Sequence, residues 1–264
     1  MIADRVNRRL RPLLLTACFA LAAGGAIAQV APATPATTAA PAMAEAPLPA
    51  LAPFDARYAV FRDGKLLGDA SLQLVALGSA RWRVDLRIEA TRGLMGLAGV
   101  DLQQSTVFDV AGNQYRPLSQ ATVRKALFGK RQVTGTYDWT RHAAQWTGDV
   151  KKKRRGAVPL QDGDMSGLLI NLAVQRDAAP GATLRYRFVD EGRAREQLYR
   201  VSAQREAQQV DDLSYAALRV DRVRAGADTT TLWVVEAVPM PIRIFQRDDE
   251  GETLELRLID YREV

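Results

Sequence analysis

Apolar and polar residues alternate with a period of two along most of the chain from Phe54 onward. The clearest example begins at Trp82, where every second residue through Ala90 is apolar and the residues between them are charged. Successive side chains of a strand point to opposite faces, so this spacing predicts a strand with one buried face. Weaker alternation predicts strands at residues 55–62, 66–76, 101–110, 118–126, 131–138, 143–150, 183–190, 194–203, 213–223, 229–237, 241–247 and 254–258.

Short turn sequences such as Asp63-Gly64 and Glu191-Gly192 separate many of these strands. Short connections join antiparallel neighbours, and about a dozen strands in one sheet must curl. The sequence therefore predicts a mainly β fold, a large curved antiparallel sheet that forms an open or partial barrel. In the last strand the apolar residues change phase at Ile259 and Tyr261, which predicts a β-bulge.

One segment has helical instead of alternating spacing. Apolar residues recur there at offsets of 0, 3, 4, 7 and 8, which defines a stripe along a helix of about three turns. Asp164 is placed to cap the N-terminus of this helix, and Pro180-Gly181 ends the region. We expect the stripe to pack on the concave face of the sheet. The stripe consists of Met165, Leu168, Leu169, Leu172 and Ala173.

Residues 1–28 carry the three parts of a secretory signal peptide. Four arginines between positions 5 and 11 are followed by an apolar stretch from Leu13 to Ala23, which is too short to span a membrane comfortably. Ala26-Ile27-Ala28 then supplies the small residues that signal peptidase recognises, so cleavage is predicted between Ala28 and Gln29.

A lipoprotein processing site is the alternative. Leu15-Thr16-Ala17-Cys18 resembles such a site, and Cys18 would then become the lipidated first residue. The stretch between Arg11 and Cys18 is short for an apolar region, and the better cleavage site lies downstream. Both readings predict export and no transmembrane helix in the mature chain.

Composition divides the mature chain into two parts. Residues 29–53 consist mainly of Ala, Pro and Thr, with one charge and no aromatic residue, which predicts a disordered linker. Residues 54–264, roughly 210 residues, are enough for one self-sufficient β-rich domain. Cleavage after Ala28 also removes Cys18, so no disulfide can support this domain.

The net charge of the mature chain is smaller than that of the full chain. The full chain has 36 basic and 30 acidic residues, and removal of four arginines and Asp4 leaves 32 and 29, a net charge of +3. Nucleic-acid-binding proteins usually carry a concentrated basic face, so no nucleic-acid partner is expected.

Several short motifs occur in order along the folded part: the Tyr58 strand with Gly64 and Gly68, Tyr115-Arg116-Pro117, Asp164-Met165-Ser166, Leu232-Trp233, Met240-Pro241-Ile242-Arg243 and Gly251. Together they resemble the DUF3108 family, exported bacterial proteins of unknown function. The resemblance implies an exported, periplasmic β-rich protein, and it brings no established activity. The fold is also similar in style to the open barrels of periplasmic lipoprotein carriers, which is an analogy of fold only.

No catalytic or metal-binding motif is found. His142 is the only histidine, and no Gly-x-Ser-x-Gly elbow or phosphate-binding glycine loop occurs. A zinc site built from histidine and cysteine ligands is therefore not expected, and no cofactor is expected either. The acidic pairs Asp162/Asp164 and Asp211/Asp212 could bind calcium, but a helix cap and a turn explain them more simply. We therefore expect a protein that is not an enzyme.

Three features have both a functional and a structural interpretation. Asp164 and Ser166 could bind an anionic group at a helix N-terminus, or simply cap it. The basic run of Lys151, Lys152, Lys153, Arg154 and Arg155, with Lys125, Lys130 and Arg131 on nearby strands, could meet anionic lipid or an envelope polymer, or be a solvated edge. The glycine-flanked loop at residues 93–99 could rim an apolar opening, or cover the core.

Three functions remain from these observations. The first is a binding protein of the cell envelope that holds a lipid or other hydrophobic group in a cavity lined by Leu86, Ile88, Leu168, Leu169 and Leu172. The second is an interaction module in envelope assembly. The third is a polysaccharide-acting enzyme, which requires two carboxylates in one cleft.

Overall fold

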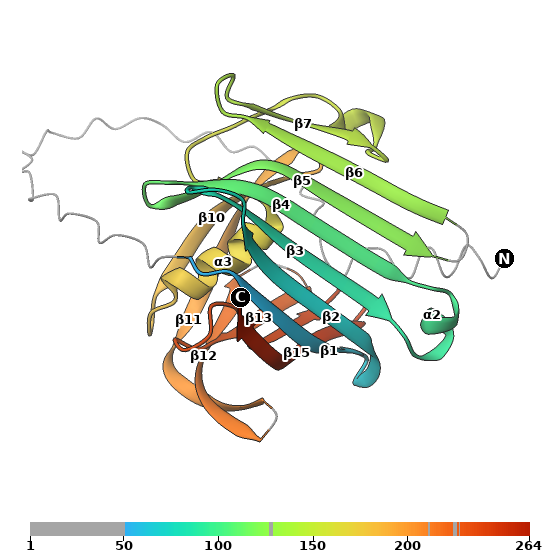
Figure 1. Cartoon of the computed structure of the whole chain (residues 1–264), viewed down its shortest axis with the longest axis vertical. Helices are drawn as coiled ribbons and strands as arrows, with labels where there is room; N and C mark the ends of the chain where they lie inside the picture. The colour runs from blue at the N-terminus through green and yellow to red at the C-terminus, as the bar shows by residue number, and fades with distance from the viewer. Residues whose placement is uncertain (1–50, 127–128, 211, 224–225, 227) are drawn as a thin grey trace, which may run out of the picture.

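The computed structural model describes residues 51–126, 129–210, 212–223, 226 and 228–264, apart from the side chains of Leu94 and Leu97 (Figure 1). Most described residues belong to strands. The strands are β1 (Phe54–Arg62), β2 (Lys65–Ala76), β3 (Arg81–Ala90), β4 (Asp101–Ala111), β5 (Gln114–Ala126), β6 (Gly129–Asp138), β7 (Ala143–Gly148), β8 (Val158–Pro159), β9 (Asp164–Met165), β10 (Thr183–Asp190), β11 (Arg193–Val210), β12 (Leu213–Val223), β13 (Thr229–Val234), β14 (Arg243–Arg247) and β15 (Thr253–Glu263). The helices are α2 (Gly93–Leu97), η1 (Lys152–Arg154) and α3 (Gly167–Asp177).

These strands form one continuous sheet in the order β8-β7-β6-β5-β4-β3-β2-β1-β15-β14-β13-β12-β11-β10-β9. Within the described residues the paired strands are antiparallel, except that the short β9 pairs in parallel with β10. The first and last long strands, β1 and β15, pair with each other in the middle of the sheet. The predicted fold class, a large curved sheet with one amphipathic helix, is confirmed.

The two edges of the sheet come close together because the chain crosses directly from one to the other. Only residues 160–163 separate β8, at one edge, from β9, at the opposite edge. A segment of this length spans at most about 18 Å. The sheet must therefore curl into a barrel-like form, although no pair of described strands closes it by hydrogen bonds between β8 and β9.

Side chains close the gap that the strands leave open. We call the contact between the β5–β8 side and the β10 side the seam. A separate apolar cluster fills it, with Trp146 and Tyr137 packed edge to face at a ring-centroid distance of 5.7 Å. The cluster consists of Val133, Tyr137, Ala144, Trp146, Val150, Val158, Leu160 and Val189.

Helix α3 lies inside the curled sheet. Figure 1 shows it between the wall of β1–β6 and the wall that contains β10–β12. Its buried face consists of Leu168, Leu169, Ile170, Leu172, Ala173 and Val174, and these residues join the main core cluster. The predicted length of about three turns and the position on the concave face agree with this arrangement. Met165 of the predicted stripe does not belong to the helix, because it lies in β9 and α3 begins at Gly167.

The phase change predicted at the end of the chain is a true β-bulge. Arg57 of β1 faces Asp260, but the next residue, Tyr58, faces Leu258, so Ile259 is the extra residue. Beyond the bulge Tyr261 packs on the core and Asp260 faces outward with Arg57. The sequence at residues 93–99, expected to be a loop, instead contains the five-residue helix α2.

Candidate functional site

The space between α3 and the sheet is almost completely filled. The five residues predicted to line a ligand cavity, Leu86, Ile88, Leu168, Leu169 and Leu172, are all at most 7% exposed. The cavity that remains beside Tyr58, Leu86 and Leu172 has a volume of about 20 Å³. Pockets for small molecules usually measure about 300–1,000 Å³, whereas this space would hold about one water molecule.

The prediction that Asp164 caps α3 is wrong. The residue at the N-cap position is Ser166, and its side chain makes no capping hydrogen bond. Its hydroxyl instead lies 2.9 Å from the hydroxyl of Thr106 on β4. Asp164 belongs to β9, where it is fully buried and its carboxylate accepts from Nη1 of Arg187 at 2.6 and 2.7 Å. A buried carboxylate needs such a charged partner, and this need outweighs a capping role.

A second polar group lies at the seam. Gln120 of β5 donates to the carboxylate of Asp190 on β10. The hydroxyl of Tyr137 lies 2.7 Å from the carbonyl of Val189 and 2.6 Å from Oε1 of Gln120. Burial, with the negative charge of Glu191, raises the pKa of Asp190 to about 6. Burial, with the charges of Asp190 and Asp164, also raises the pKa of Tyr137. These contacts join β5 and β6 to β10 across the seam.

Four of the five residues of the predicted basic run are exposed. Lys151, Lys152, Lys153 and Arg155 point to solvent in and around η1. Arg154 does not, because its guanidinium is only 11% exposed and pairs with Glu191 at 3.4 Å across the seam. The run is thus an exposed surface with one structural member.

Further cations from β5 and β6 extend this surface. Lys125 and Lys130 face each other across these strands, and Nη2 of Arg131 donates to the carbonyl of Asp149, two residues before Lys151. We call this surface the basic edge. It consists of Lys125, Lys130, Arg131, Lys151, Lys152, Lys153 and Arg155.

A larger hollow lies on the outer face of the sheet, where the sequence suggested no site. It has a volume of about 420 Å³ over β1, β2 and β15. Two ion pairs cross it: Nη2 of Arg57 lies 3.2 Å from Oδ2 of Asp260, and Nη2 of Arg262 lies 2.9 Å from Oδ2 of Asp55. We call it the outer groove. Its lining residues are Asp55, Ala56, Arg57, Ser71, Gln73, Asp260 and Arg262.

The sequence contained one signal for the outer groove. Without the bulge at Ile259, strict alternation would turn Asp260 and Arg262 toward the core. The bulge instead brings them opposite Arg57 and Asp55. The sequence shows the phase change. It does not show that Asp260 and Arg262 face β1, because that depends on β1 and β15 being neighbours.

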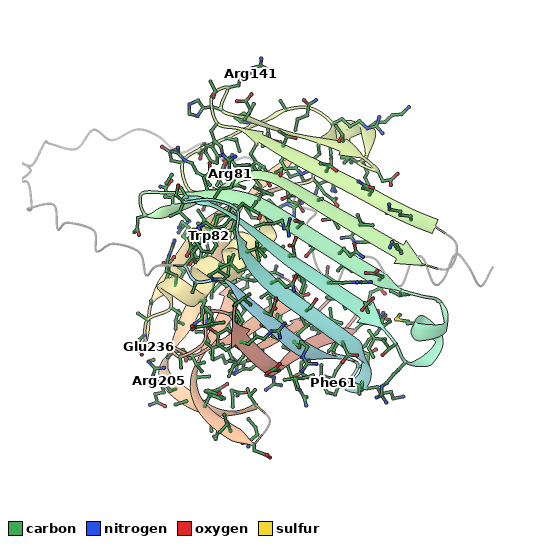
Figure 2. The ribbon with its side chains drawn as sticks, in the orientation of Figure 1. Phe61, Arg81, Trp82, Arg141, Arg205 and Glu236 are labelled. Carbon is green, nitrogen blue, oxygen red and sulfur yellow. The ribbon has the colours of Figure 1, made fainter. Side chains whose placement is uncertain are left out.

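The other sequence candidates are not brought together. His142 is exposed in the β6–β7 turn, next to Arg141 at the top of Figure 2, and its φ is +49°. Asp162 pairs with Arg116 at 3.1 Å. Within the described ranges no three His, Cys, Asp or Glu side chains form a group that could hold a metal ion. Asp211, Cys18, Ala28 and Gln29 lie outside the described residues.

The motif residues make structural contacts. The hydroxyl of Tyr58 donates to the carbonyl of Pro241 at 2.9 Å. The guanidinium of Arg243 stacks on the ring of Trp233 at 4.3 Å. A Cβ at Gly68 would lie 1.9 Å from the carbonyl oxygen of Glu89, so only glycine permits this approach of β2 to β3. These contacts of the motif residues therefore stabilise the fold.

The fold and these contacts define a mostly β protein with a barrel-like sheet around one helix. Residues 54–257 match the model of the family described as "Protein of unknown function (DUF3108)", and the chain belongs to this family. No curated protein matches the chain.

A solved structure has a similar fold. It is described as a "Beta-barrel-like Protein of Domain of Unknown Function DUF1849 from Brucella abortus". The TM-score is 0.52 at 11% identity, and the match covers 81% of this chain and 98% of that chain. At this identity the likeness concerns the fold alone. No helix in the described part of the chain is both long and apolar enough to cross a membrane.

Proposed function

We propose that this protein is an exported, non-enzymatic binding protein of the cell envelope whose basic edge contacts an anionic membrane surface. The observation that carries the proposal is the exposed cluster of lysine and arginine side chains at the β5–β6 end and around η1. Export itself rests on the sequence of residues 1–28.

The exposed lysines of the basic edge favour a diffuse electrostatic contact. Lysine side chains are flexible point charges, and each adds about 1 kcal/mol of attraction near an anionic membrane surface. Lys151, Lys152 and Lys153 have no carboxylate partner among the ion pairs of the described residues. Their charge is therefore available to a partner.

The interior gives less support to the hypothesis of a lipid carrier. A cavity of about 20 Å³ is far below the volume of ordinary ligand pockets, so a bound lipid would require α3 to move away from the sheet. A peripheral contact with the headgroups requires no such movement.

Vesicle sedimentation tests the proposal. The mature chain is mixed with vesicles of neutral phosphatidylcholine or of phosphatidylcholine with phosphatidylglycerol. We expect binding to the anionic vesicles only, with a loss of about tenfold or more in the variant Lys151→Gln, Lys152→Gln, Lys153→Gln, Arg155→Gln. Binding should also weaken as salt is raised.

A control variant removes the same number of exposed charges elsewhere. Lys65→Gln, Arg92→Gln, Arg200→Gln and Arg205→Gln are all outside the basic edge, and Figure 2 shows Arg205 near the bottom, opposite β6 and β7. This control should bind anionic vesicles like the wild type. Equal loss in both variants would mean that only net charge matters. Binding to a soluble polyanion without vesicle binding would overturn the membrane assignment.

A further inference from the structure

The outer groove has the size of a ligand site and an unusual polar lining. Its volume of about 420 Å³ falls within the range of about 300–1,000 Å³ typical of small-molecule pockets. Ala56 is the one apolar residue in the lining, and it is 1% exposed. Every other lining side chain ends in a charged or hydrogen-bonding group, so the groove presents polar groups along its whole length.

The lining is organised in two rows that run across three strands. In the first row, Ser71 of β2, Arg57 of β1 and Asp260 of β15 are register neighbours. In the second row, Gln73, Asp55 and Arg262 occupy the same three strands. The charges alternate both along and across the rows, because arginine lies in the middle of one row and aspartate in the middle of the other.

This alternation makes the groove neutral as a whole. Each guanidinium already has a carboxylate partner, at 3.2 Å in the first row and 2.9 Å in the second. A charged ligand of either sign would have to compete with one of these ion pairs. A neutral ligand would not, so charge complementarity selects against anions and cations alike.

The groove retains many free hydrogen-bonding positions. A guanidinium has five N–H donors and a carboxylate can accept about four hydrogen bonds, so each ion pair leaves several of both kinds unused. The side chains of Arg57 and Arg262 are 69% and 73% exposed, so their remaining donors are accessible. Ser71 and Gln73 add groups that both donate and accept.

We propose that the outer groove binds a neutral polyhydroxylated ligand of the chemical class of a saccharide chain. Hydroxyl groups donate and accept at the same atom, which matches a surface where donors and acceptors alternate at close spacing. This site lies on β1, β2 and β15, on strands other than those of the basic edge, and it works through hydrogen bonds instead of net charge. It is therefore a second binding function, independent of the membrane contact.

Titration with oligosaccharides tests the site. The probes are two neutral tetrasaccharides, maltotetraose and tetraacetylchitotetraose, and the acidic tetragalacturonate, each followed by NMR of the ¹⁵N-labelled mature chain up to about 10 mM. We expect at least one neutral probe to shift the amides of β1, β2 and β15 around Asp55, Ser71 and Asp260. Binding should change little with salt, because no net charge is neutralised.

Two double variants distinguish this site from the rest of the surface. Asp55→Asn with Arg262→Gln removes one ion pair of the groove at constant net charge, and we expect binding to weaken about tenfold or more. Arg185→Gln with Glu196→Gln removes another cross-strand ion pair, 2.6 Å apart on β10 and β11, and should leave binding unchanged. NMR spectra of both variants report directly whether each remains folded.

Three outcomes would overturn the inference. They are no shift with either neutral probe, tighter binding of the acidic probe, and shifts outside the three strands. None of these results depends on vesicle binding, and a failure of the membrane proposal would leave the groove titration unaffected.

Discussion

At the scale of single residues, the most informative contrast is between two carboxylates in opposite surroundings. Asp190 lies at the seam, where burial and the negative charge of Glu191 raise its pKa to about 6. Glu255 lies on the outer face of β15, only 8% exposed, between the guanidinium groups of Arg243 and Arg257. Burial alone would raise the pKa of Glu255, but hydrogen bonds and charge from these two arginines lower it.

Asp190→Asn should stabilise the protein at neutral and alkaline pH. The pKa of the Asp190 carboxyl is 3.8 without these surroundings and about 6 in the fold, so the folded state binds the proton more tightly. Stability therefore falls as pH rises from about 4 to 6, and the cost is fully present above this window. We expect the variant to exceed the wild type by about 1–3 kcal/mol at pH 8 in urea denaturation.

The same comparison at pH 4 provides the control for Asp190. There the wild-type carboxyl is largely protonated in the folded state, so the two proteins should differ little. An equal difference at pH 4 and pH 8 would show that the effect comes from packing and not from ionisation.

Glu255→Gln should have the opposite sign. Because the folded pKa of Glu255 is lowered, its ionised form contributes stability above the usual glutamate range, and this stability is lost as pH falls through the folded pKa. We expect a loss of about 1 kcal/mol at pH 7, since Arg243 and Arg257 are themselves 31% and 50% exposed. The difference should shrink below about pH 4 in the same urea measurement. A gain in stability at pH 7 would contradict the assignment.

At the scale of secondary structure, the sequence predicted the long elements well, for a simple reason. A strand with one buried face has an apolar residue at every second position, as in β3 from Arg81 to Ala90. Helix α3 has an apolar stripe at helical spacing. The bulge at Ile259 is also visible in the sequence, because it changes the phase of the alternation.

The elements that sequence reasoning missed have no pattern of their own. Strands β8 and β9 have two residues each, too few to show a period, and their positions depend on the curl of the whole sheet. Asp164 was assigned to a helix cap because its partner, Arg187, lies 23 residues away on β10. The residues of the outer groove look like ordinary solvent-facing charges until β1 and β15 are known to be neighbours.

A pair of leucine variants tests how much α3 depends on the sheet. Leu169 has 0% exposure and lies on the buried stripe, so Leu169→Ala should cost about 2–5 kcal/mol because it opens a cavity in a filled core. Leu213, at the start of β12, is 61% exposed, and Leu213→Ala should change the free energy of unfolding by less than about 0.5 kcal/mol. Thermal or urea denaturation of both variants gives the comparison. Near-equal effects would indicate that α3 packs loosely.

At the scale of the whole molecule, the sheet is joined in two physically different ways. The first and last long strands, β1 and β15, pair through backbone hydrogen bonds along nine register positions. Among the described residues, the opposite side of the barrel, the seam, is joined by side chains and by the crossing segment at residues 160–163. Backbone ladders distribute their strength over many bonds, whereas the seam depends on a few contacts. The seam is therefore the place where this barrel should open first.

Tyr137→Phe tests this difference between the two joints. The substitution keeps the ring against Trp146 but removes the hydroxyl that lies 2.7 Å from the carbonyl of Val189 on β10. We expect a loss of about 1–2 kcal/mol, since a buried acceptor loses its donor. Tyr261→Phe, which removes a hydroxyl bonded to the exposed Glu263 at 3.1 Å, is the matched control and should have little effect.

Hydrogen exchange then shows where the barrel opens in Tyr137→Phe. Protection should fall in β6 and β7 and also in β10, although about 50 residues separate Tyr137 from Val189 along the chain, while β1, β2 and β15 keep theirs. Protection should fall in these strands together because the Tyr137 hydroxyl connects β6 to β10 across the seam. If protection instead falls uniformly over the sheet, the seam does not open separately, and the barrel unfolds as one cooperative unit from all sides.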